Sequence, residues 1–455
     1  MENKQFDLII VGGGISALSL AHFVNKFQPG LNILLLEKTS RLGGAIRSSS
    51  EDGYLFEWGP HGFLDNVPES MELLNDLNFG DEILRASLKQ FKRYMCMHGK
   101  LHELPQSPLK IIKSPVMPFS GKLRVLGELI KRPIVSEQTI ADWAAHRFGK
   151  SMLPIADIAV TGTYAGDIEK LSIDAVMPGL RKLELEAGSL FRGLMKNRKK
   201  SPHKKLPTMI SFRGGMEELV KKLSKNANIQ YETQVDHLEK GDTGWKISTS
   251  KGTYQCKQVA LAMHINDSLK LLNELHPAPR QSVPVAHITN IGMGFGPEAK
   301  IPFGFGFLAP KTEKRFALGS LFPTHMFKNR APKGVMTMEV LVGGTRNPEY
   351  LELKEDELKA RALKDMRELL ELPKNPVHTN VITSSTGLPQ LEIGHHKLQA
   401  YRDEMIQKYP GVFIHGCGWD GIGVNEMVRD ARQTAEYIVS GSKETVQPKV
   451  KGVYF

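Results

Sequence analysis

A glycine-rich turn near the N-terminus constrains the fold of this chain more than any other feature. The run Phe6–Val11 is short, apolar and β-branched, and it leads directly into Gly12–Gly14 and a stretch of helical character. That stretch ends at Gln28–Gly30, and a second apolar run, Leu31–Glu37, follows at once. Two parallel strands joined by a crossover helix in so short a span form a βαβ unit, so we expect a parallel sheet here.

The turn also has the spacing of a dinucleotide-binding site. In the pattern Gly12-x-Gly14-x-x-Ala17, the first glycine permits a tight turn and the second lets the backbone approach a diphosphate at the helix N-terminus. Glu37 ends the second strand, where a carboxylate can accept hydrogen bonds from ribose hydroxyls. A purely structural turn would use glycine too, but this context favours a dinucleotide. The residues expected to contact it are Gly12, Gly13, Gly14, Ile15, Ser16, Ala17 and Glu37.

Two further segments argue for FAD over NAD. Arg41–Ser48 resembles the second glycine element of the glutathione-reductase-type flavoproteins, above all of their amine-oxidase-like branch. Phe56–Gly62 resembles the loop that passes beside the flavin ring in the same proteins. The resemblance implies FAD contacts from Arg41, Gly44, Ala45, Gly59, Pro60, His61 and Gly62.

The end of the chain supplies a third element. Phe413–Asn425 has the pattern of a strand, a glycine loop and the start of a helix, and it resembles the C-terminal flavin motif of the same group. A helix N-terminus aimed at the flavin would stabilise the negative charge of the reduced ring. The resemblance adds Val235, Cys417, Ile422, Gly423 and Val424 to the FAD contacts. A chain that returns at its end to its first domain implies a split FAD-binding domain.

Motifs in the middle and late parts of the chain make the resemblance more specific. They are Tyr164–Ser172, Glu186–Leu190, Phe212–Met216, Gly304–Pro310 and Leu388–His395. Together with the FAD elements they are similar to the oxygen-dependent protoporphyrinogen oxidase family over nearly the whole chain. The resemblance implies an α/β fold, with a glutathione-reductase-type, Rossmann-like FAD-binding domain, a mixed-sheet substrate domain and a helical, membrane-associating subdomain.

The same resemblance implies a porphyrinogen substrate, a mostly apolar macrocycle that carries propionates and lies against the flavin. It implies substrate contacts from Arg93, Gly162, Phe305, Leu308 and Leu341, with Arg93 pairing with a propionate. From the residues alone, the three apolar side chains would be ordinary core and Arg93 a surface charge.

Catalysis in this family needs few protein groups. The flavin accepts hydride and passes electrons to dioxygen, which gives hydrogen peroxide, so we expect no essential side-chain acid or base and no metal ion. His61 and the adjacent pair His395 and His396 are interpreted as packing or hydrogen-bonding residues.

Charge is concentrated in the middle of the chain. The formal net charge is +11, and residues 85–213 hold 24 Lys and Arg against 10 Asp and Glu, so the remainder is slightly acidic. A basic segment attracts anions such as a carboxylate substrate or an acidic membrane surface. For its densest part, Lys196–Lys205, a solvated loop is favoured over membrane binding, and nucleic acid is excluded because no aromatic interleaving accompanies it.

Composition sets the broad class. With 41% hydrophobic and 24% charged residues the chain is ordinary globular protein, and it has no apolar run long enough to span a bilayer and no signal peptide. Cys96, Cys256 and Cys417 form no CxxC pair, which excludes a disulfide framework and favours a reducing compartment. We therefore expect a cytoplasmic protein, with peripheral contact to a membrane left open.

The pattern along the chain predicts five segments. They are a first FAD-binding part (1–75), a helical basic subdomain interleaved with the substrate domain (76–205), a second FAD-binding part (206–265), the substrate domain (266–405) and a third FAD-binding part (406–455). Residues 66–150 and 151–200 are predicted to be mainly helical, and residues 228–263 and 284–345 strand-rich. Lys354–Leu372 and Asn425–Val439 are predicted helices.

Several alternatives stay open at this stage. Coproporphyrinogen III would undergo the same chemistry as protoporphyrinogen IX. An FAD oxidase of amines or polyenes and a non-catalytic carrier of hydrophobic ligands would both fit the glycine motifs. A homodimer also stays open, as does an interfacial role for Leu109–Phe119, which mixes apolar and basic residues.

Overall fold

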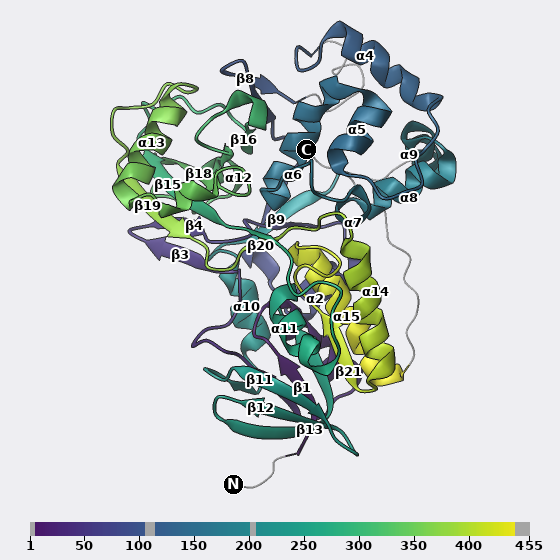
Figure 1. Cartoon of the computed structure of the whole chain (residues 1–455). Coiled ribbons are helices and arrows are strands. Elements are labelled where there is room, and N and C mark those ends of the chain that lie inside the picture. The colour runs from purple at the N-terminus through teal and green to yellow at the C-terminus, as the bar shows by residue number, and fades with distance from the viewer. Residues whose placement is uncertain (1–4, 105–113, 201–205, 442–455) are drawn as a thin grey trace.

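The computed structural model describes residues 5–104, 114–200 and 206–441 (Figure 1). Both chain termini and two internal segments lie outside the described residues, and with them the expectations for residues 105–113 and 201–205. Figure 1 shows one sheet at the bottom, a second sheet at the upper left and a group of helices at the upper right.

The lower part is built on a seven-stranded sheet whose strands come from three distant stretches of chain. In spatial order it contains β10 (Ile229–Gln230), β2 (Ile33–Leu36), β1 (Gln5–Val11), β13 (Gly252–Ala262), β12 (Trp245–Thr249) and β11 (Val235–Lys240), and β21 (Val412–His415) also pairs with β13. The strands β10, β2, β1, β13 and β21 pair in parallel. This confirms the predicted βαβ unit and the return of the chain's end to its first sheet.

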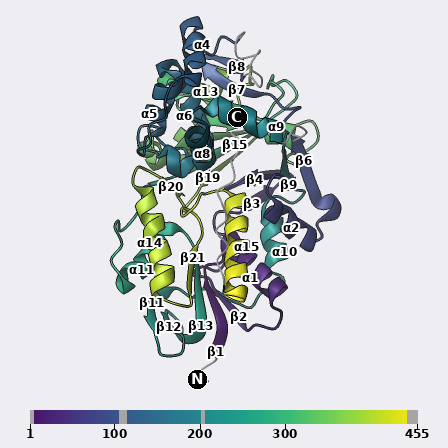
Figure 2. The ribbon, with the colours of Figure 1, turned by 90° about the vertical axis from the view of Figure 1, so that its right-hand side faces the viewer.

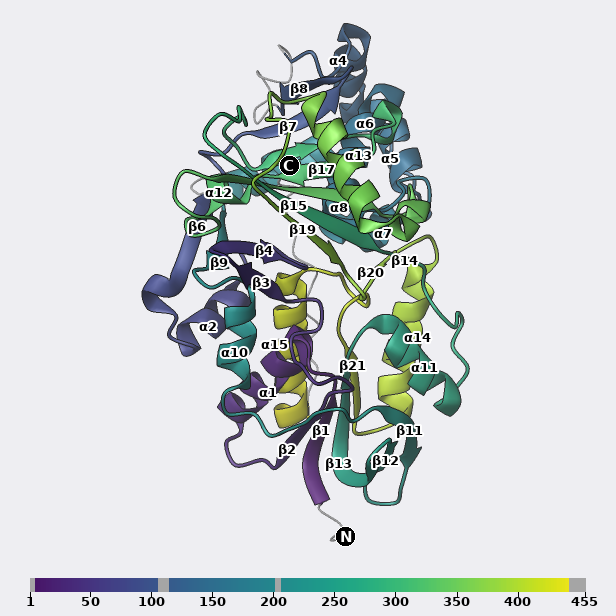
Figure 3. The same cartoon turned by 90° about the vertical axis from the view of Figure 1, so that its left-hand side faces the viewer.

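Helices cover both faces of this sheet. On one face lie α1 (Ile15–Phe27), α10 (Glu217–Ser224) and α15 (Val424–Ser440), and on the other lie α11 (Ile265–Leu275) and α14 (His395–Lys408). Figures 2 and 3 show α1 and α15 side by side, with α14 on the far side of β21. Because both faces are covered, successive residues such as Leu8, Ile9 and Ile10 are all buried, which explains the unbroken apolar run.

The upper part is built on a second seven-stranded sheet. Its order is β19 (His378–Thr383), β15 (Ile288–Phe295), β18 (Met336–Gly343), β17 (Gly319–Leu321), β16 (Gly306–Leu308), β7 (Arg93–Met97) and β8 (Lys100–Glu103). The sheet is mixed, because only β16 and β7 pair in parallel. Helix α13 (Glu355–Arg367) covers one face, where Met338 and Val340 pack with Leu358 and Met366.

Small elements join the two parts. The strand pair β3 (Ser48–Glu51) and β4 (Tyr54–Glu57), the three-stranded sheet β5 (Phe63–Leu64), β9 (Thr208–Phe212) and β6 (Ile83–Ser87), and the pair β14 (Val285–Ala286) and β20 (Leu388–Pro389) lie between the large sheets in Figure 3. The remaining short elements are α2 (Pro68–Asp76), α12 (Pro323–Met326), η1 (Gly80–Glu82), η4 (Lys311–Glu313) and η5 (Pro348–Glu352).

The prediction that residues 66–150 are mainly helical is wrong for 83–103. That stretch forms the strands β6, β7 and β8, and β7 and β8 make an antiparallel hairpin in which Met97 pairs with Lys100. His98 and Gly99 both have positive φ, 51° and 68°, which is what a two-residue type I′ hairpin requires. The two-residue turn His98–Gly99 between two short segments was the local signal that the helical interpretation overlooked.

The helical group confirms the prediction for residues 151–200. It comprises α4 (Phe119–Leu126), η2 (Gly127–Leu129), α5 (Ile140–Phe148), η3 (Lys150–Met152), α6 (Leu153–Tyr164), α7 (Ile173–Val176), α8 (Pro178–Ala187) and α9 (Leu190–Lys200). Within the described part of the chain, no helix is both long enough and apolar enough to cross a membrane.

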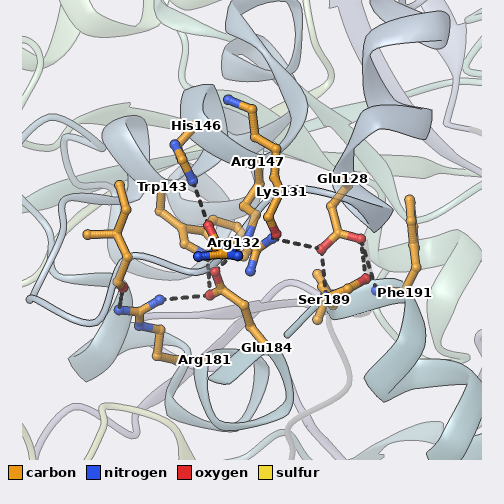
Figure 4. Close-up of polar contacts among 12 residues, drawn as sticks. Glu128, Lys131, Arg132, Trp143, His146, Arg147, Arg181, Glu184, Ser189 and Phe191 are labelled. Atoms are coloured by element: carbon orange, nitrogen blue, oxygen red, sulfur yellow. Dashed lines mark hydrogen bonds and ion pairs between the residues drawn. The ribbon is translucent and has the colours of Figure 1, made fainter. Parts of the chain in front are cut away.

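A buried network of charges joins these helices (Figure 4). Glu184 of α8 accepts hydrogen bonds from Trp143 Nε1 at 2.7 Å, Arg147 Nε at 2.5 Å and Arg181 Nη1 at 2.8 Å. Arg147 also lies 3.4 Å from Glu128, whose carboxylate accepts from Ser189 Oγ and the Leu190 N–H at the start of α9. Since these charges are almost fully buried, each needs its partners to offset the cost of desolvation.

Candidate active site

The first glycine turn has a conformation that only glycine adopts readily. Gly12 has φ +115°, and a Cβ there would lie 2.7 Å from the Ala262 carbonyl oxygen on the neighbouring strand β13. Gly14 ends the turn with ordinary backbone angles, and a Cβ there would meet no atom of the described residues within 4 Å. The turn therefore packs tightly on its strand side and leaves open space at the N-terminus of α1.

That helix N-terminus is suited to an anion. No side chain caps it, and its first turn contains no acidic residue, so the N–H groups of its first turn are left for a ligand. Ala17 is fully buried against the sheet, which is the close packing predicted for the third position of the motif.

A second glycine loop lies directly against the first. Gly43 N–H donates to the Gly13 carbonyl at 2.8 Å, and a Cβ on Gly44 would approach Gly14 Cα at 3.5 Å. The guanidinium of Arg41 donates to the carbonyls of Leu42 and Gly44, at 2.8 and 2.5 Å. Arg41 thus fixes the backbone of the loop, and the structure brings together the two segments expected to hold the diphosphate.

Glu37 lies at the carboxyl end of β2, beside these loops. One oxygen, Oε1, accepts from Thr39 N–H at 2.8 Å and Thr39 Oγ1 at 2.7 Å, while a Cβ on Gly13 would meet the other, Oε2, at 2.7 Å. The Glu37 carbonyl accepts from Thr233 N–H, which places Val235 at the start of β11 close by. The position predicted for ribose recognition therefore lies at the carboxyl end of β2, beside the segment that leads into β11.

The third glycine loop closes the arrangement at the start of α15. Gly423 is the N-cap, and its N–H donates to Glu426 Oε2 at 3.1 Å. Asn425 donates to the Leu64 carbonyl at 2.9 Å and accepts from Ser70 Oγ at 2.7 Å, which ties the helix start to the segment after Gly62. Ile422 packs against the helical group, and Cys417 lies just before the loop at the end of β21.

The loop Gly59–Gly62 lies between these elements. A Cβ on Gly59 would come within 2.2 Å of the Ala45 carbonyl oxygen, so this loop touches the second glycine loop closely. Its other end continues into β5, where Leu64 meets α15 as described. Between them, His61 Nε2 lies 2.7 Å from Glu339 Oε2 on β18 of the upper sheet.

Several residues expected to contact the substrate lie on the face of the upper sheet opposite α13. Leu308 pairs with Gly319, and Gly319 pairs with Leu341, so both leucines point to the same face in one row. A Cβ on Gly162 of α6 would lie 2.8 Å from Leu308 Cδ1, so the helix backbone touches that row. The next row on the same face begins at Arg93, which pairs with Gly306.

Arg93 is a half-buried cation without a carboxylate partner among the described residues. Its guanidinium lies 5.5 Å from the centroid of the Phe305 ring, and no acidic side chain of the described residues forms an ion pair with it. Burial lowers the pKa of Arg93 to about 10. Because a charged guanidinium is costly to bury alone, this position is prepared for an anion that the chain itself does not supply.

Comparison with known proteins now decides the class of this site. The family described as flavin containing amine oxidoreductase matches residues 27–439. This chain belongs to the flavin-containing amine oxidoreductase family. It is therefore an FAD-dependent oxidase, and the three glycine loops are its candidate FAD-binding residues.

Similar proteins span the same length. Coproporphyrinogen III oxidase of Bacillus subtilis (strain 168) is 23% identical, covering 94% of this chain and 97% of that protein. The mitochondrial protoporphyrinogen oxidase of Nicotiana tabacum is 28% identical, covering 95% and 94%. A crystal structure from Exiguobacterium sp. 255-15, whose protein carries the provisional name protoporphyrinogen oxidase, superposes with TM-score 0.81 at 22% identity, covering 96% and 100%. At that identity the superposition shows the shared fold.

The residues of this flavin-containing oxidoreductase fit FAD. The space beside Gly14 and the uncapped start of α1 suit a diphosphate, and Glu37 is placed for a ribose. Burial raises the pKa of the thiols of Cys96, Cys256 and Cys417 to about 12, so these cysteines are protonated and poor nucleophiles at neutral pH. The described residues contain no cluster of His, Cys, Asp or Glu arranged to hold a metal ion.

Sequence reasoning missed the polar residues on the upper sheet that meet the loop Gly59–Gly62. Glu339 is 1% exposed and accepts from His61 and from Asn290 Nδ2, which also donates to the Glu57 carbonyl at 3.1 Å. Glu57 in turn lies 3.8 Å from Arg330. A signal was present, because Glu339 is the single acid in the otherwise apolar strand Met336–Gly343.

Proposed function

We propose that this flavoenzyme oxidises protoporphyrinogen IX to protoporphyrin IX, with dioxygen as the electron acceptor and hydrogen peroxide as the second product. Each porphyrinogen loses six hydrogen atoms, and three dioxygen molecules take them up as hydrogen peroxide. The observation that carries the proposal is Arg93, a half-buried cation without an ion-pair partner in the described residues, on the same sheet face as Leu308 and Leu341. A half-buried cation beside these two leucines suits an apolar macrocycle with a carboxylate.

The side chains bind and orient the substrate in this proposal. Leu308 and Leu341 contact the macrocycle. Because Gly162 has no side chain, the backbone of α6 leaves room for the flat macrocycle beside Leu308. Arg93 pairs with a propionate and so fixes the in-plane orientation, because a charge-assisted bond is stronger and more directional than apolar contact. Bound FAD supplies the hydride acceptor, which no protein side chain provides. Positioning is then the chain's own contribution to rate.

The relatives support a porphyrinogen but include enzymes of both candidate substrates. Those named above are a coproporphyrinogen III oxidase and a protoporphyrinogen oxidase, at 23% and 28% identity. We favour protoporphyrinogen IX because it carries two propionates fewer than coproporphyrinogen III. Arg93, a single half-buried cation without an ion-pair partner among the described residues, serves the less charged substrate better.

A direct assay tests this proposal. Purified holoenzyme is mixed in air with protoporphyrinogen IX or with coproporphyrinogen III, and porphyrin fluorescence and hydrogen peroxide are recorded together. We expect both products from protoporphyrinogen IX with a kcat/KM above that for coproporphyrinogen III. A higher kcat/KM for coproporphyrinogen III would make coproporphyrinogen III the substrate of the same oxidation. Turnover of an amine or a polyene without turnover of either porphyrinogen would refute the proposal, and a colourless protein would indicate a carrier.

We also propose that the helical group rests on an anionic membrane surface. Phe119 and Leu123 on α4 and Ile130 and Val135 after η2 are exposed apolar side chains, with exposed fractions of 74%, 54%, 84% and 80%. Arg124 lies among them and is exposed as well. Exposed apolar side chains interspersed with cations are typical of interfacial segments.

Sedimentation with phospholipid vesicles tests this surface. Wild-type protein should bind vesicles that contain anionic lipid and bind zwitterionic vesicles less. Phe119→Ser combined with Ile130→Ser should abolish sedimentation, while Val377→Ser, an equally exposed apolar residue beside β19, should leave it unchanged. Equal binding by the double variant and wild type would contradict the proposal.

A further inference from the structure

The contact between His61 and Glu339 joins the FAD-binding part to the upper sheet. His61 lies on the loop that touches Ala45 of the second glycine loop at one end and continues toward the start of α15 at the other. Glu339 pairs with Leu321, which pairs with Gly306, which pairs with Arg93. His61 therefore lies where the three glycine loops meet the face that carries the proposed substrate contacts.

The imidazole has one end fixed and the other open. Nε2 lies 2.7 Å from Glu339 Oε2, and the Glu339 side chain is only 1% exposed. The His61 side chain is 16% exposed, and within the described residues its other nitrogen, Nδ1, has no hydrogen-bond partner. The sheet thus holds the ring through Nε2, and Nδ1 makes no hydrogen bond with the described residues.

The charges around the ring favour an imidazolium. The groups that face it are Glu339 on β18, Glu57 on β4 and Arg330 in the segment before β18. Glu339 contacts the ring directly, and a protonated His61 balances its charge. Burial raises the pKa of Glu57, so Glu339 is the main partner of the imidazolium. Burial by itself would lower the pKa of His61, but Glu339, and after it Glu57, raise it above its ordinary value.

We propose that His61, held in its protonated form by Glu339, is a positive group that raises the reduction potential of bound FAD. Two-electron reduction adds negative charge to the flavin ring, and a fixed cation beside the ring stabilises the reduced form more than the oxidised form. Glu339 acts through His61 and is a positioning residue. The inference rests on FAD binding and is independent of which substrate the enzyme takes.

The test is an anaerobic redox titration of the purified holoenzyme with a reference dye, from pH 6 to pH 9. We expect His61→Gln to lower the equilibrium constant for flavin reduction at least tenfold at neutral pH, which is about 30 mV for a two-electron couple. Glu339→Gln should lower it in the same direction while His61 itself is kept. Above the His61 pKa, wild type and His61→Gln should converge, because the histidine is then neutral.

The chain offers a matched control. His237 Nδ1 also lies 2.7 Å from a glutamate, Glu274, but this pair is about half exposed on β11 and α11, away from the glycine loops. His237→Gln should leave the potential unchanged at every pH. FAD content and Tm of each variant are measured in parallel, and if His61→Gln does not retain FAD, Glu339→Gln alone decides. A potential in the retained variants equal to wild type across the pH range would overturn the proposal.

Discussion

The guanidinium of Arg93 lies 5.5 Å from the centre of the Phe305 ring, and among the described residues no ion pair with an acidic side chain accompanies this contact. Arg93 begins strand β7, and Phe305 immediately precedes β16, the strand that pairs with β7 in parallel. The two side chains are therefore fixed by one ladder of backbone hydrogen bonds, and the cation is positioned before any substrate arrives.

Replacing Arg93 by Ala should impair substrate binding without harming the fold. Removing a charge–carboxylate bond should raise KM by about 5- to 150-fold, or about 1–3 kcal/mol, with a smaller effect on kcat. Stability should not fall, since the half-buried charge that is removed has no ion-pair partner among the described residues. Steady-state kinetics and Tm check this. Arg361→Ala, an arginine 6.0 Å from the Phe316 ring on exposed α13, is the control and should leave KM unchanged. Unaltered KM in Arg93→Ala would refute the propionate role.

Adding a methyl group at Gly162 should leave the stability of the fold intact but weaken substrate binding. Gly162→Ala adds a good helix former to α6, worth about 1 kcal/mol, while its Cβ would lie 2.8 Å from the flexible end of Leu308. We expect Tm to hold or rise and KM to increase as Leu308 is displaced over the substrate face. Combining Gly162→Ala with Leu308→Val should restore part of the affinity. A normal KM in the single variant would contradict this contact.

Substitutions of Gly14 and Gly12 in the first turn should have different effects, the first on FAD affinity and the second on stability. Gly14→Ala introduces a methyl into open space at an ordinary backbone conformation, so the apoprotein should fold with near-normal stability. FAD affinity should nevertheless fall, because the methyl group occupies the space expected for the diphosphate. Gly12→Ala should destabilise the fold itself, since φ is +115° and the Ala262 oxygen is 2.7 Å away. Calorimetric FAD titration and urea unfolding distinguish the two, and unchanged FAD affinity in Gly14→Ala would contradict the site.

Stability should fall as pH rises because of Asp430 on α15. Burial raises the pKa of this carboxyl to about 7, and the nearby Asp420 adds to the effect. An acid whose pKa is raised by folding stays protonated in the native state while the unfolded chain has lost the proton. Its contribution to stability is therefore intact below about pH 4 and declines until about pH 7.

Asp430→Asn should remove this pH dependence. The variant should be more stable than wild type at pH 8, by about 1–3 kcal/mol, and should lose the advantage at pH 4. Urea unfolding at several pH values measures the difference, with the exposed Asp236→Asn as control. A constant offset between Asp430→Asn and wild type at all pH values would show that Asp430 does not titrate as described.

The helical group should depend on its buried charges. Glu184→Gln leaves Arg147 and Arg181 facing a neutral amide and should cost about 3–5 kcal/mol. Glu371→Gln, which breaks the exposed pair of Glu371 with Lys300, should leave stability nearly unchanged, because solvent screens this pair. Chemical unfolding compares the two, and equal small losses would mean that the network in Figure 4 contributes little to stability.

The elements that the sequence predicted best are those that depend on local patterns. The turn Gly12–Gly14, the strands from 228 to 263 and the helix beginning at Val424 were all readable because period, glycine spacing and strand propensity are local properties. The hairpin at His98–Gly99 was equally local, and its type I′ conformation was overlooked among proline breaks.

What could not be read from the sequence depends on contacts across long separations. His61 and Glu339 are 278 positions apart, and no periodicity links a loop residue with one acid in a strand. The network around Glu184 has the same character, since Glu128, Arg147 and Arg181 look like solvated charges until the helices pack around them. The contacts expected for the substrate came from family resemblance, and the structure adds that Leu308, Leu341 and Arg93 lie on one face.

Anaerobic titration of the holoenzyme with protoporphyrinogen IX tests the central claim most directly. Oxidised flavin absorbs near about 450 nm, and this absorbance should disappear as substrate is added without oxygen. Because each porphyrinogen gives up six electrons and each flavin takes two, one equivalent of substrate should bleach about three equivalents of enzyme and leave fluorescent porphyrin. Flavin that stays oxidised in the presence of excess protoporphyrinogen IX and of excess coproporphyrinogen III would contradict the account.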